Sequence, residues 1–195
     1  MTIAGLAARI HATPARLGAV RLVCIDGPAG SGKTTLAARL AEALGDAAAI
    51  VHFDELYAGW TITGAQGRLQ AGVLGPLSAG RDGSHHRFDW ARRRFGTEPV
   101  AVPVREVVLV EGCGSSPRAL DPWTSMRIWV EAPADLRLSR GLARDGSDLE
   151  HEWRRWLATE AAEFAREGTR ARADLRLDGA RSDPASADDG LPPLP

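Results

Sequence analysis

The sequence predicts an α/β protein of three layers, in which a parallel five-stranded sheet is covered by helices on both faces. Short apolar runs alternate with amphipathic segments along the chain. The apolar runs are strand-like and lack a polar face, which is typical of strands buried on both sides in a parallel sheet. With 195 residues, the chain is long enough for one domain with a complete core.

Five runs are predicted as strands, namely residues 19–25, 48–53, 107–110, 126–130 and 173–177. Residues 33–44 form the first predicted helix, with Leu36, Leu40 and Leu44 on one face and Gly45 as its stop. Pro133 is expected to open a second helix that continues to about residue 144.

A capping-box pattern at residues 147–150 predicts the start of a longer third helix. Its apolar stripe has ordinary amphipathic spacing, which favours core packing, and consists of Leu149, Trp153, Trp156, Leu157, Ala161 and Phe164. We also expect the remaining large aromatic residues, Trp90, Trp123 and Trp129, to be packing residues rather than ligand contacts.

The composition excludes several classes of protein. A net charge of −1 and a pI near 6.5 argue against a nucleic-acid-binding protein, and no apolar run is long enough to cross a membrane. Cys24 and Cys113 lack the spacing of metal ligands and lie in or beside apolar runs, which favours reduced core thiols in a cytoplasmic protein. We therefore expect a single domain over residues 1–179 and a flexible tail over residues 180–195.

The most specific motif follows the first predicted strand. Residues 27–34 read Gly-Pro-Ala-Gly-Ser-Gly-Lys-Thr and fit the G-x-x-x-x-G-K-[ST] pattern of a phosphate-binding loop, the P-loop. Of the 24 lysine and arginine residues, only Lys33 is a lysine, and it occupies the position where phosphate chemistry requires a point charge. The sequence thus predicts a nucleotide-binding site in a P-loop NTPase fold, with these donor-binding residues: Gly27, Ala29, Gly30, Ser31, Gly32, Lys33, Thr34 and Thr35.

Two alternatives among P-loop proteins are unfavourable. A GTPase needs an Asn-Lys-x-Asp motif to read guanine, and this chain has no asparagine and no second lysine. The signature of ABC-type ATPases is absent, and the chain is short for an AAA-type motor. A small-molecule kinase is therefore the class that best fits the motif.

Further segments resemble the uridine kinase-like group of P-loop small-molecule kinases. Residues 25–35 resemble the loop of that group, and His52-Phe53-Asp54-Glu55-Leu56-Tyr57 resembles its Asp-x-x-Tyr segment. Residues 108–112, Val-Leu-Val-Glu-Gly, are similar to its third strand with an acidic end, and Arg137, Arg140 and Arg144-Asp145 are similar to its arginine-rich lid segment. Residues 87–90, Arg-Phe-Asp-Trp, stand where the family has an aromatic and acidic acceptor segment. The likeness runs from about residue 20 to residue 178, and it implies that Asp54 serves the acceptor hydroxyl.

Phosphoryl transfer needs positioning and charge neutralisation, and the predicted strand ends carry suitable groups. Asp54 is the candidate base, with Lys33 and Arg140 as further catalytic residues; Asp54 as a turn residue or helix cap is the alternative. Thr34, Glu111 and Asp54 are the candidate Mg²⁺ ligands, although Glu111 could instead be a salt-bridged strand end. Arg137 and Arg144 are expected to bind donor phosphates, or to lie on a solvated helix face.

Residues 57–100 form a long, glycine-rich connection, which is typical of a lid or substrate-binding segment. The candidate acceptor contacts are Tyr57, Trp60, Arg87, Asp89, Arg93 and Glu111. A surface excursion with its own small apolar cluster is the alternative for this segment.

These observations predict a phosphotransferase that uses ATP and Mg²⁺ and moves the γ-phosphate to a hydroxyl of a nucleoside or another small polar metabolite. Its expected partner is the small-molecule acceptor, with no nucleic acid and no membrane; a homodimer is left open. A nucleotide-hydrolysing regulatory module and a nucleoside monophosphate kinase remain as alternatives.

Overall fold

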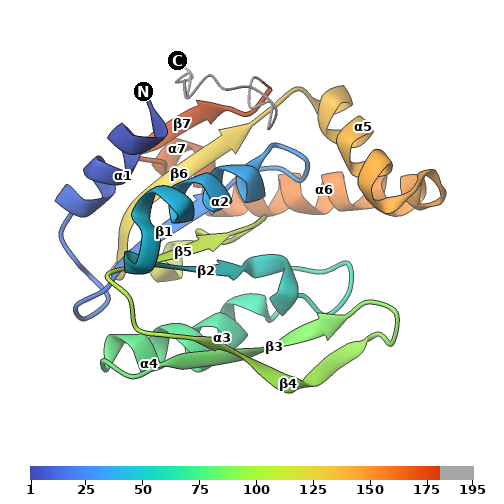
Figure 1. Ribbon diagram of the computed structural model, residues 1–195. Helices are drawn as coiled ribbons and strands as arrows, with labels where there is room; N and C mark the ends of the chain where they lie inside the picture. The colour runs from blue at the N-terminus through green and yellow to red at the C-terminus, as the bar shows by residue number, and fades with distance from the viewer. Residues whose placement is uncertain (181–195) are drawn as a thin grey trace.

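A five-stranded parallel sheet forms the centre of the computed structural model, which describes residues 1–180 (Figure 1). The strand order is β2 (Ala48–His52), β5 (Val107–Glu111), β1 (Arg21–Asp26), β6 (Thr124–Glu131) and β7 (Leu175–Asp178). All five predicted strands are confirmed, as is the three-layer P-loop fold. The predicted tail lies outside the described residues, apart from Ala180.

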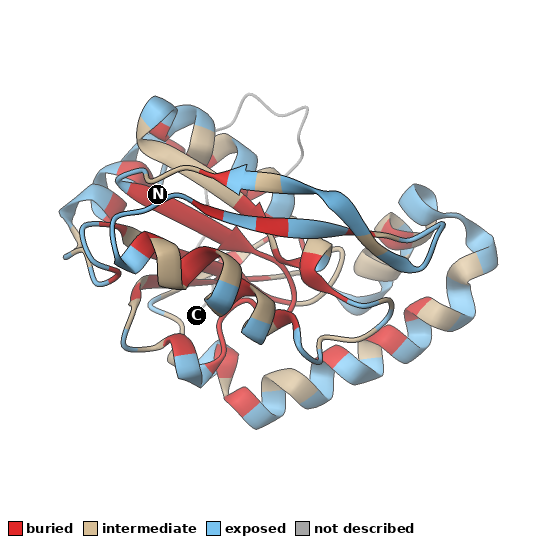
Figure 2. Ribbon diagram, turned by 90° about the horizontal axis from the view of Figure 1, so that it is seen from below, coloured by how far each residue is buried: buried red, intermediate tan, exposed pale blue. Residues whose placement is uncertain are grey.

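The central strands are buried on both faces because their side chains alternate between two apolar clusters. In β1, Leu22 and Cys24 point into one cluster, whereas Val23 and Ile25 point into the other. Figure 2 shows these strands in red at the centre of the protein, between helices whose outer surfaces are pale blue. Both cysteines are buried and free.

Helices α1 (Ile3–Ala12) and α2 (Lys33–Leu44) cover one face of the sheet. The bounds of α2 are those predicted from the sequence, and Gly45 ends the helix with a φ of 57°. Helix α1 was not predicted from the sequence. Among residues 1–180, no helix has the length and apolar character that crossing a bilayer requires.

The other face of the sheet is covered by α6 (Glu150–Glu167) and by the segment between β2 and β5. That segment contains α3 (Ala65–Leu69), a π-helical turn at Gln70–Leu74, α4 (Gly75–Ser78) and an antiparallel hairpin of β3 (Gly83–Asp89) and β4 (Arg94–Val102). It is therefore an ordered subdomain. Leu69, Leu74 and Leu77 are fully buried in the sheet's core, so the alternative of a separate surface excursion is wrong.

The predicted capping box at residues 147–150 does not form. Ser147–Leu149 is a 3-10 turn, and α6 begins at Glu150 with Leu149 as an N-cap that makes no side-chain hydrogen bond. The apolar stripe on α6 is also narrower than predicted: Trp153 and Trp156 are buried, whereas Ala161 is exposed.

Several short elements connect the strands and the longer helices. The 3-10 turns are η1 (Gly45–Ala47), η2 (Phe53–Leu56), η4 (Arg118–Leu120) and η5 (Ser147–Leu149), and α7 (Thr169–Arg172) leads into β7.

Glu55 in η2 accepts a hydrogen bond from His85 at 2.8 Å and pairs with Arg87 at 2.7 Å, which ties the hairpin to the end of β2. This contact fixes the turn that contains Asp54.

Helix α5 (Ala134–Asp145) packs on α6 through a glycine. A Cβ atom on Gly141 would lie 2.4 Å from the ring of Trp153, which is only 1% exposed. Gly141 therefore lets α5 lie directly on the indole ring, and this close packing sets the position of the arginines on α5.

We predict that Gly141→Ala destabilises the protein, although alanine is the better helix former. The methyl group would collide with the buried Trp153 ring, and overpacking of this kind costs about 1–3 kcal/mol. Gly67→Ala is the matched control, because Gly67 is also helical and has no atom within 4 Å of a built Cβ; it should be neutral or stabilise by up to about 1 kcal/mol. Equal melting temperatures for the two variants would contradict this account of the α5–α6 contact.

Candidate active site

The phosphate-binding loop joins β1 to the N-terminus of α2 and is shaped by glycines with positive φ. Gly27, Gly30 and Gly32 have φ values of 142°, 77° and 98°. A Cβ atom on Gly27 would lie 2.0 Å from the carbonyl oxygen of Val130, and one on Gly30 would lie 2.5 Å from that of Arg137. The loop thus runs so close to neighbouring backbone that only glycine fits at these two positions.

The polar groups of the loop suit a phosphate ligand. Lys33 Nζ donates to the carbonyl oxygen of Pro28 at 2.9 Å and contacts Cys113 Sγ at 3.6 Å, which holds the buried ammonium under the loop. The buried hydroxyl of Ser31 has no hydrogen-bond partner within residues 1–180. Ser31 is fully buried, and neither Ser31 nor Gly27 lines the cavity that the rest of the loop shares with Glu111, although both were predicted to bind the donor. The N-terminus of α2 adds a favourable field for an anion.

Glu111, at the end of β5, lies beside the first residues of α2. Thr34 Oγ1 donates to Glu111 Oε1 at 3.1 Å, and His52 Nδ1 lies 2.7 Å from the same oxygen. The hydrogen bond to Glu111 raises the pKa of His52 above its ordinary value. His52 was not identified from the sequence as a site residue; its place at the end of β2, next to β5, was the available signal.

The hydroxyl oxygen of Thr34 and the carboxylate oxygens of Glu111 are of the kind that Mg²⁺ prefers. Within residues 1–180, no three His, Cys, Asp or Glu side chains gather into a cluster that could hold a metal ion by themselves. Mg²⁺ characteristically takes one or two protein carboxylates together with water and substrate phosphates. The hydroxyl of Thr34 and the carboxylate of Glu111 therefore fit a Mg²⁺ ion held jointly with a nucleotide.

Asp54 lies in η2 and lines the same cavity as the loop and Glu111. Desolvation by the surrounding cavity wall raises the pKa of Asp54, and the nearby negative charge of Glu111 raises it further. A carboxylate with a raised pKa is a stronger proton acceptor than an ordinary aspartate. The structure thus brings this candidate base to the cavity.

Two of the three predicted arginines on α5 line the cavity. Arg140 lies over the loop, where it donates to the carbonyl oxygens of Gly30 at 3.3 Å and Gly179 at 3.0 Å. Arg144 makes a two-pronged contact with Asp145. Arg137 points elsewhere: its guanidinium pairs with Glu160 at 2.9 Å, and the cavity wall does not include it.

The remaining wall of the cavity is aromatic. Trp60 is 39% exposed and Trp90 46% exposed, and their ring centroids are 5.5 Å apart. The other members of this aromatic wall are Tyr57, Trp153 and Trp156. Trp90, which was predicted to be a packing residue, packs on the rings of Trp60 and Phe88, but it does so outside the core, where its ring also lines the cavity. Trp123 and Trp129 do pack in the interior, as predicted.

Three predicted acceptor contacts lie on the hairpin but not on the cavity wall. Arg87 is engaged by Glu55, and Asp89 binds the backbone N–H and the guanidinium of Arg92. Arg93 occupies the turn with a φ of 52°. The structure does not bring these side chains to Asp54.

The residues that do converge enclose a cavity of about 930 Å³ at the carboxyl edge of the sheet. This volume lies in the usual range for small-molecule sites. Its lining combines the loop (Ala29, Gly30, Gly32, Lys33, Thr34 and Thr35) with Asp54, Glu111, Arg140, Arg144 and the aromatic wall. The cavity therefore brings the phosphate-binding loop together with two arginines, the carboxylates of Asp54 and Glu111, and an aromatic wall. Arg144 lies against this wall, with its guanidinium carbon 5.8 Å from the centroid of the Trp153 ring.

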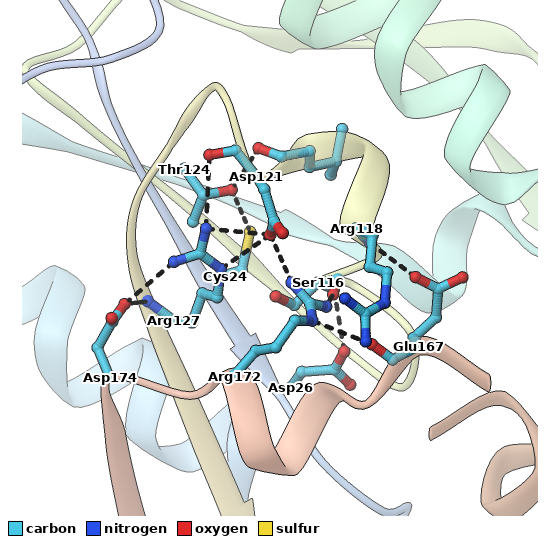
Figure 3. A network of polar contacts seen from close by, with 11 residues as sticks. Cys24, Asp26, Ser116, Arg118, Asp121, Thr124, Arg127, Glu167, Arg172 and Asp174 are labelled. Carbon is cyan, nitrogen blue, oxygen red and sulfur yellow. Dashed lines mark hydrogen bonds and ion pairs between the residues drawn. The ribbon is translucent and has the colours of Figure 1, made fainter. Parts of the chain in front are cut away.

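A buried carboxylate at the end of β1 supports the site from behind. Asp26 accepts hydrogen bonds from the backbone N–H groups of Gly27 at 2.7 Å, Gly114 at 2.8 Å and Ser116 at 2.9 Å. Arg172 donates to the carbonyl oxygen of Ser116 and pairs with Asp121, which extends the network to α7 (Figure 3). Asp26 thus joins the start of the loop to the segment after β5. Its role was not identified from the sequence, where it appeared only as part of the motif.

Comparisons with known proteins agree with the motifs. The chain is 26% identical to a uridine kinase of Halobacterium salinarum over 154 residues, which cover 69% of this chain and 68% of that protein. Its fold is similar to that of a possible uridine kinase from Bacillus stearothermophilus, with a TM-score of 0.66, 20% identity and coverage of 89% of this chain and 96% of the other.

A D-glycerate 3-kinase from Cryptococcus neoformans also has a similar fold, with a TM-score of 0.53 and 12% identity over 98% of this chain and 96% of the other. No family model matches the sequence. The resemblance to uridine kinase-like P-loop kinases that the motifs predicted is confirmed.

We predict that Asp26 imposes a pH dependence on stability. Burial raises the pKa of Asp26 from 3.8 to about 6, while its three N–H donors act in the opposite direction. From about pH 4 to about pH 6 the folded protein thus keeps a proton that the unfolded chain releases. This contribution to stability therefore falls as the pH rises through the folded pKa, and it levels off about one pH unit above that pKa. Each unit of pKa difference corresponds to about 1.4 kcal/mol.

The test is urea unfolding of wild type and Asp26→Asn from pH 4 to pH 7. The free energy of unfolding of wild type relative to Asp26→Asn should fall through this window by on the order of 1–3 kcal/mol. The exposed Asp46 provides the control, since Asp46→Asn should run parallel to wild type. Parallel curves for Asp26→Asn as well would show that Asp26 has the same pKa in the folded and the unfolded protein, which would contradict the prediction.

Proposed function

We propose that this protein is a small-molecule kinase that transfers the γ-phosphate of ATP to a hydroxyl group of a nucleoside or another small polar metabolite. One observation carries the proposal: the phosphate-binding loop, Asp54 and Glu111 line one cavity together with two arginines and an aromatic wall. The similarity to kinases of known class supports the same reaction type.

In the proposed mechanism, the loop N–H groups and Lys33 bind the phosphates of the donor and neutralise their charge. Thr34 and Glu111 would hold Mg²⁺, which when bound supplies positive charge to the β- and γ-phosphate oxygens. Arg140 and Arg144, both from α5, would stabilise the charge that spreads over the transferring group.

Asp54 would orient the acceptor hydroxyl and take its proton. The acceptor oxygen forms a bond to the γ-phosphorus as the bond from that phosphorus to the β–γ bridging oxygen breaks, and ADP leaves with the bridging electrons. Tyr57, Trp60 and Trp90 offer flat apolar surface to the body of the acceptor. An acceptor with a ring that can stack on indole fits this wall.

The cavity weighs against the variant in which the acceptor is a nucleoside monophosphate. That reaction needs cations around a second phosphate group, and the arginines available for it in the sequence were Arg87, Arg92 and Arg93. None of the three lines the cavity. A neutral or hydroxyl-bearing acceptor therefore fits better.

The test measures ADP release from Mg-ATP over a panel of nucleosides, nucleoside monophosphates, sugars and vitamins, with Asp54→Asn beside wild type. We expect one acceptor to stimulate release, and Asp54→Asn to lower that rate by about 10²–10⁴-fold, the usual contribution of a general base. The control is Asp46→Asn, which makes the same change at an exposed position and should match wild type. If no acceptor raises the rate of ATP hydrolysis, and the protein binds a partner protein only in the presence of nucleotide, the regulatory module would be favoured instead.

A further inference from the structure

Glu160 is a buried carboxylate that the proposed mechanism does not use. It lies in the second half of α6 and is 2% exposed. Its Oε2 accepts hydrogen bonds from the backbone N–H of Ala29 at 2.8 Å and from Cys113 Sγ at 3.3 Å, and its Oε1 accepts one from Arg137 at 2.9 Å. One side chain therefore contacts the phosphate-binding loop, the end of β5 and α5.

Arg137 completes the contact from the other side. Its guanidinium also donates to the carbonyl oxygen of Ala29 at 3.4 Å and to that of Ala132 at 3.0 Å. Both backbone polar groups of Ala29 are thus held, the N–H by Glu160 and the carbonyl by Arg137. We call this pair, Glu160 and Arg137, the loop clamp.

The loop clamp lies behind the cavity rather than in it. The cavity wall includes Ala29, Arg140 and Arg144 but neither Glu160 nor Arg137. Moreover, the backbone of Arg137 rests on Gly30, where an added Cβ would come within 2.5 Å of the Arg137 carbonyl oxygen. Since Arg140 and Arg144 follow Arg137 by three and seven residues on the same helix, a shift of Arg137 would move them as well.

We infer that Glu160 is a positioning residue: through Ala29 and Arg137 it holds the loop and α5 at the separation at which loop N–H groups and Arg140 can reach the same phosphates. The inference rests on the proposed function in taking a nucleoside triphosphate as the ligand of the loop. Groups that bind a transferring phosphate must be held within a fraction of an ångström, and rigid partners outside the site supply that precision.

A competing role predicts the opposite result. A carboxylate near the loop could oppose phosphates by repulsion and by occupying the Ala29 N–H, in which case its removal would tighten nucleotide binding. The burial of Glu160 and its pairing with Arg137 favour positioning, because the paired charges largely cancel at the phosphates.

The experiment measures the dissociation constant of Mg-ATP by calorimetry for the full chain carrying Glu160→Gln. Glutamine keeps an oxygen for the Ala29 N–H and removes the charge that holds Arg137. The matched control is Glu163→Gln, which makes the same change one turn later on α6, where Glu163 pairs with Arg166. We expect Glu160→Gln to weaken Mg-ATP binding at least fivefold, with Glu163→Gln within twofold of wild type.

Further measurements separate positioning from a general loss of structure. Thermal melting should show that Glu160→Gln and Arg137→Gln are each folded at the assay temperature. The double variant that carries both changes should bind Mg-ATP no more weakly than the weaker-binding of these two single variants. If Glu160→Gln does not fold, Arg137→Lys takes its place, because lysine keeps the charge but not the several contacts of the guanidinium; the same fivefold loss is expected.

Tighter binding, or a loss of less than fivefold in a folded variant, would overturn the inference. Failure of wild type to bind Mg-ATP would overturn both this inference and the proposed function. If wild type binds Mg-ATP and Glu160→Gln binds it at least fivefold more weakly, but wild type phosphorylates no acceptor, only the proposed function fails.

Discussion

The arrangement of this protein depends on one buried carboxylate at the carboxyl end of the central strand. Asp26 accepts three backbone N–H groups, one from the start of the phosphate-binding loop and two from the segment after β5. Burial of a carboxylate is costly unless its oxygens are satisfied, and here the donors come from segments nearly ninety residues apart in sequence. The interaction therefore fixes the phosphate-binding loop and the Glu111 end of β5 relative to each other. These are the two parts of the cavity that would hold the phosphates and Mg²⁺.

Helix α6 serves the fold and the site together. Its first half supplies Trp153 and Trp156, which are buried and also line the cavity, and its second half supplies Glu160 behind the loop. Because α5 rests on Trp153 through Gly141, the arginines on α5 are held by the same helix. Packing and function are thus linked through a few contacts, so we expect substitutions on this helix to affect ligand binding as well as stability.

Much of the fold and part of the site could be predicted from the sequence. Local patterns were sufficient for the five strands and α2, and Asp54 and Glu111 were expected near the loop because the ends of parallel strands share one edge. The hairpin could not be predicted in the same way: the register and turn of β3 and β4 decide that Trp90 reaches the cavity while Arg87, Asp89 and Arg93 do not. Glu160 had no distinguishing signal, since α6 carries several glutamates and only the tertiary structure buries this one against Ala29.

The most direct test of the central claim follows the γ-phosphate itself. The protein would be incubated with ATP labelled on the γ-phosphate, Mg²⁺ and a mixture of hydroxyl-bearing metabolites, and the labelled products would be separated. The account predicts that the label moves to a phosphate ester of one acceptor, with an equal amount of ADP formed. Label found solely as inorganic phosphate, whatever acceptor is present, would contradict the claim that this cavity transfers phosphate to a hydroxyl group.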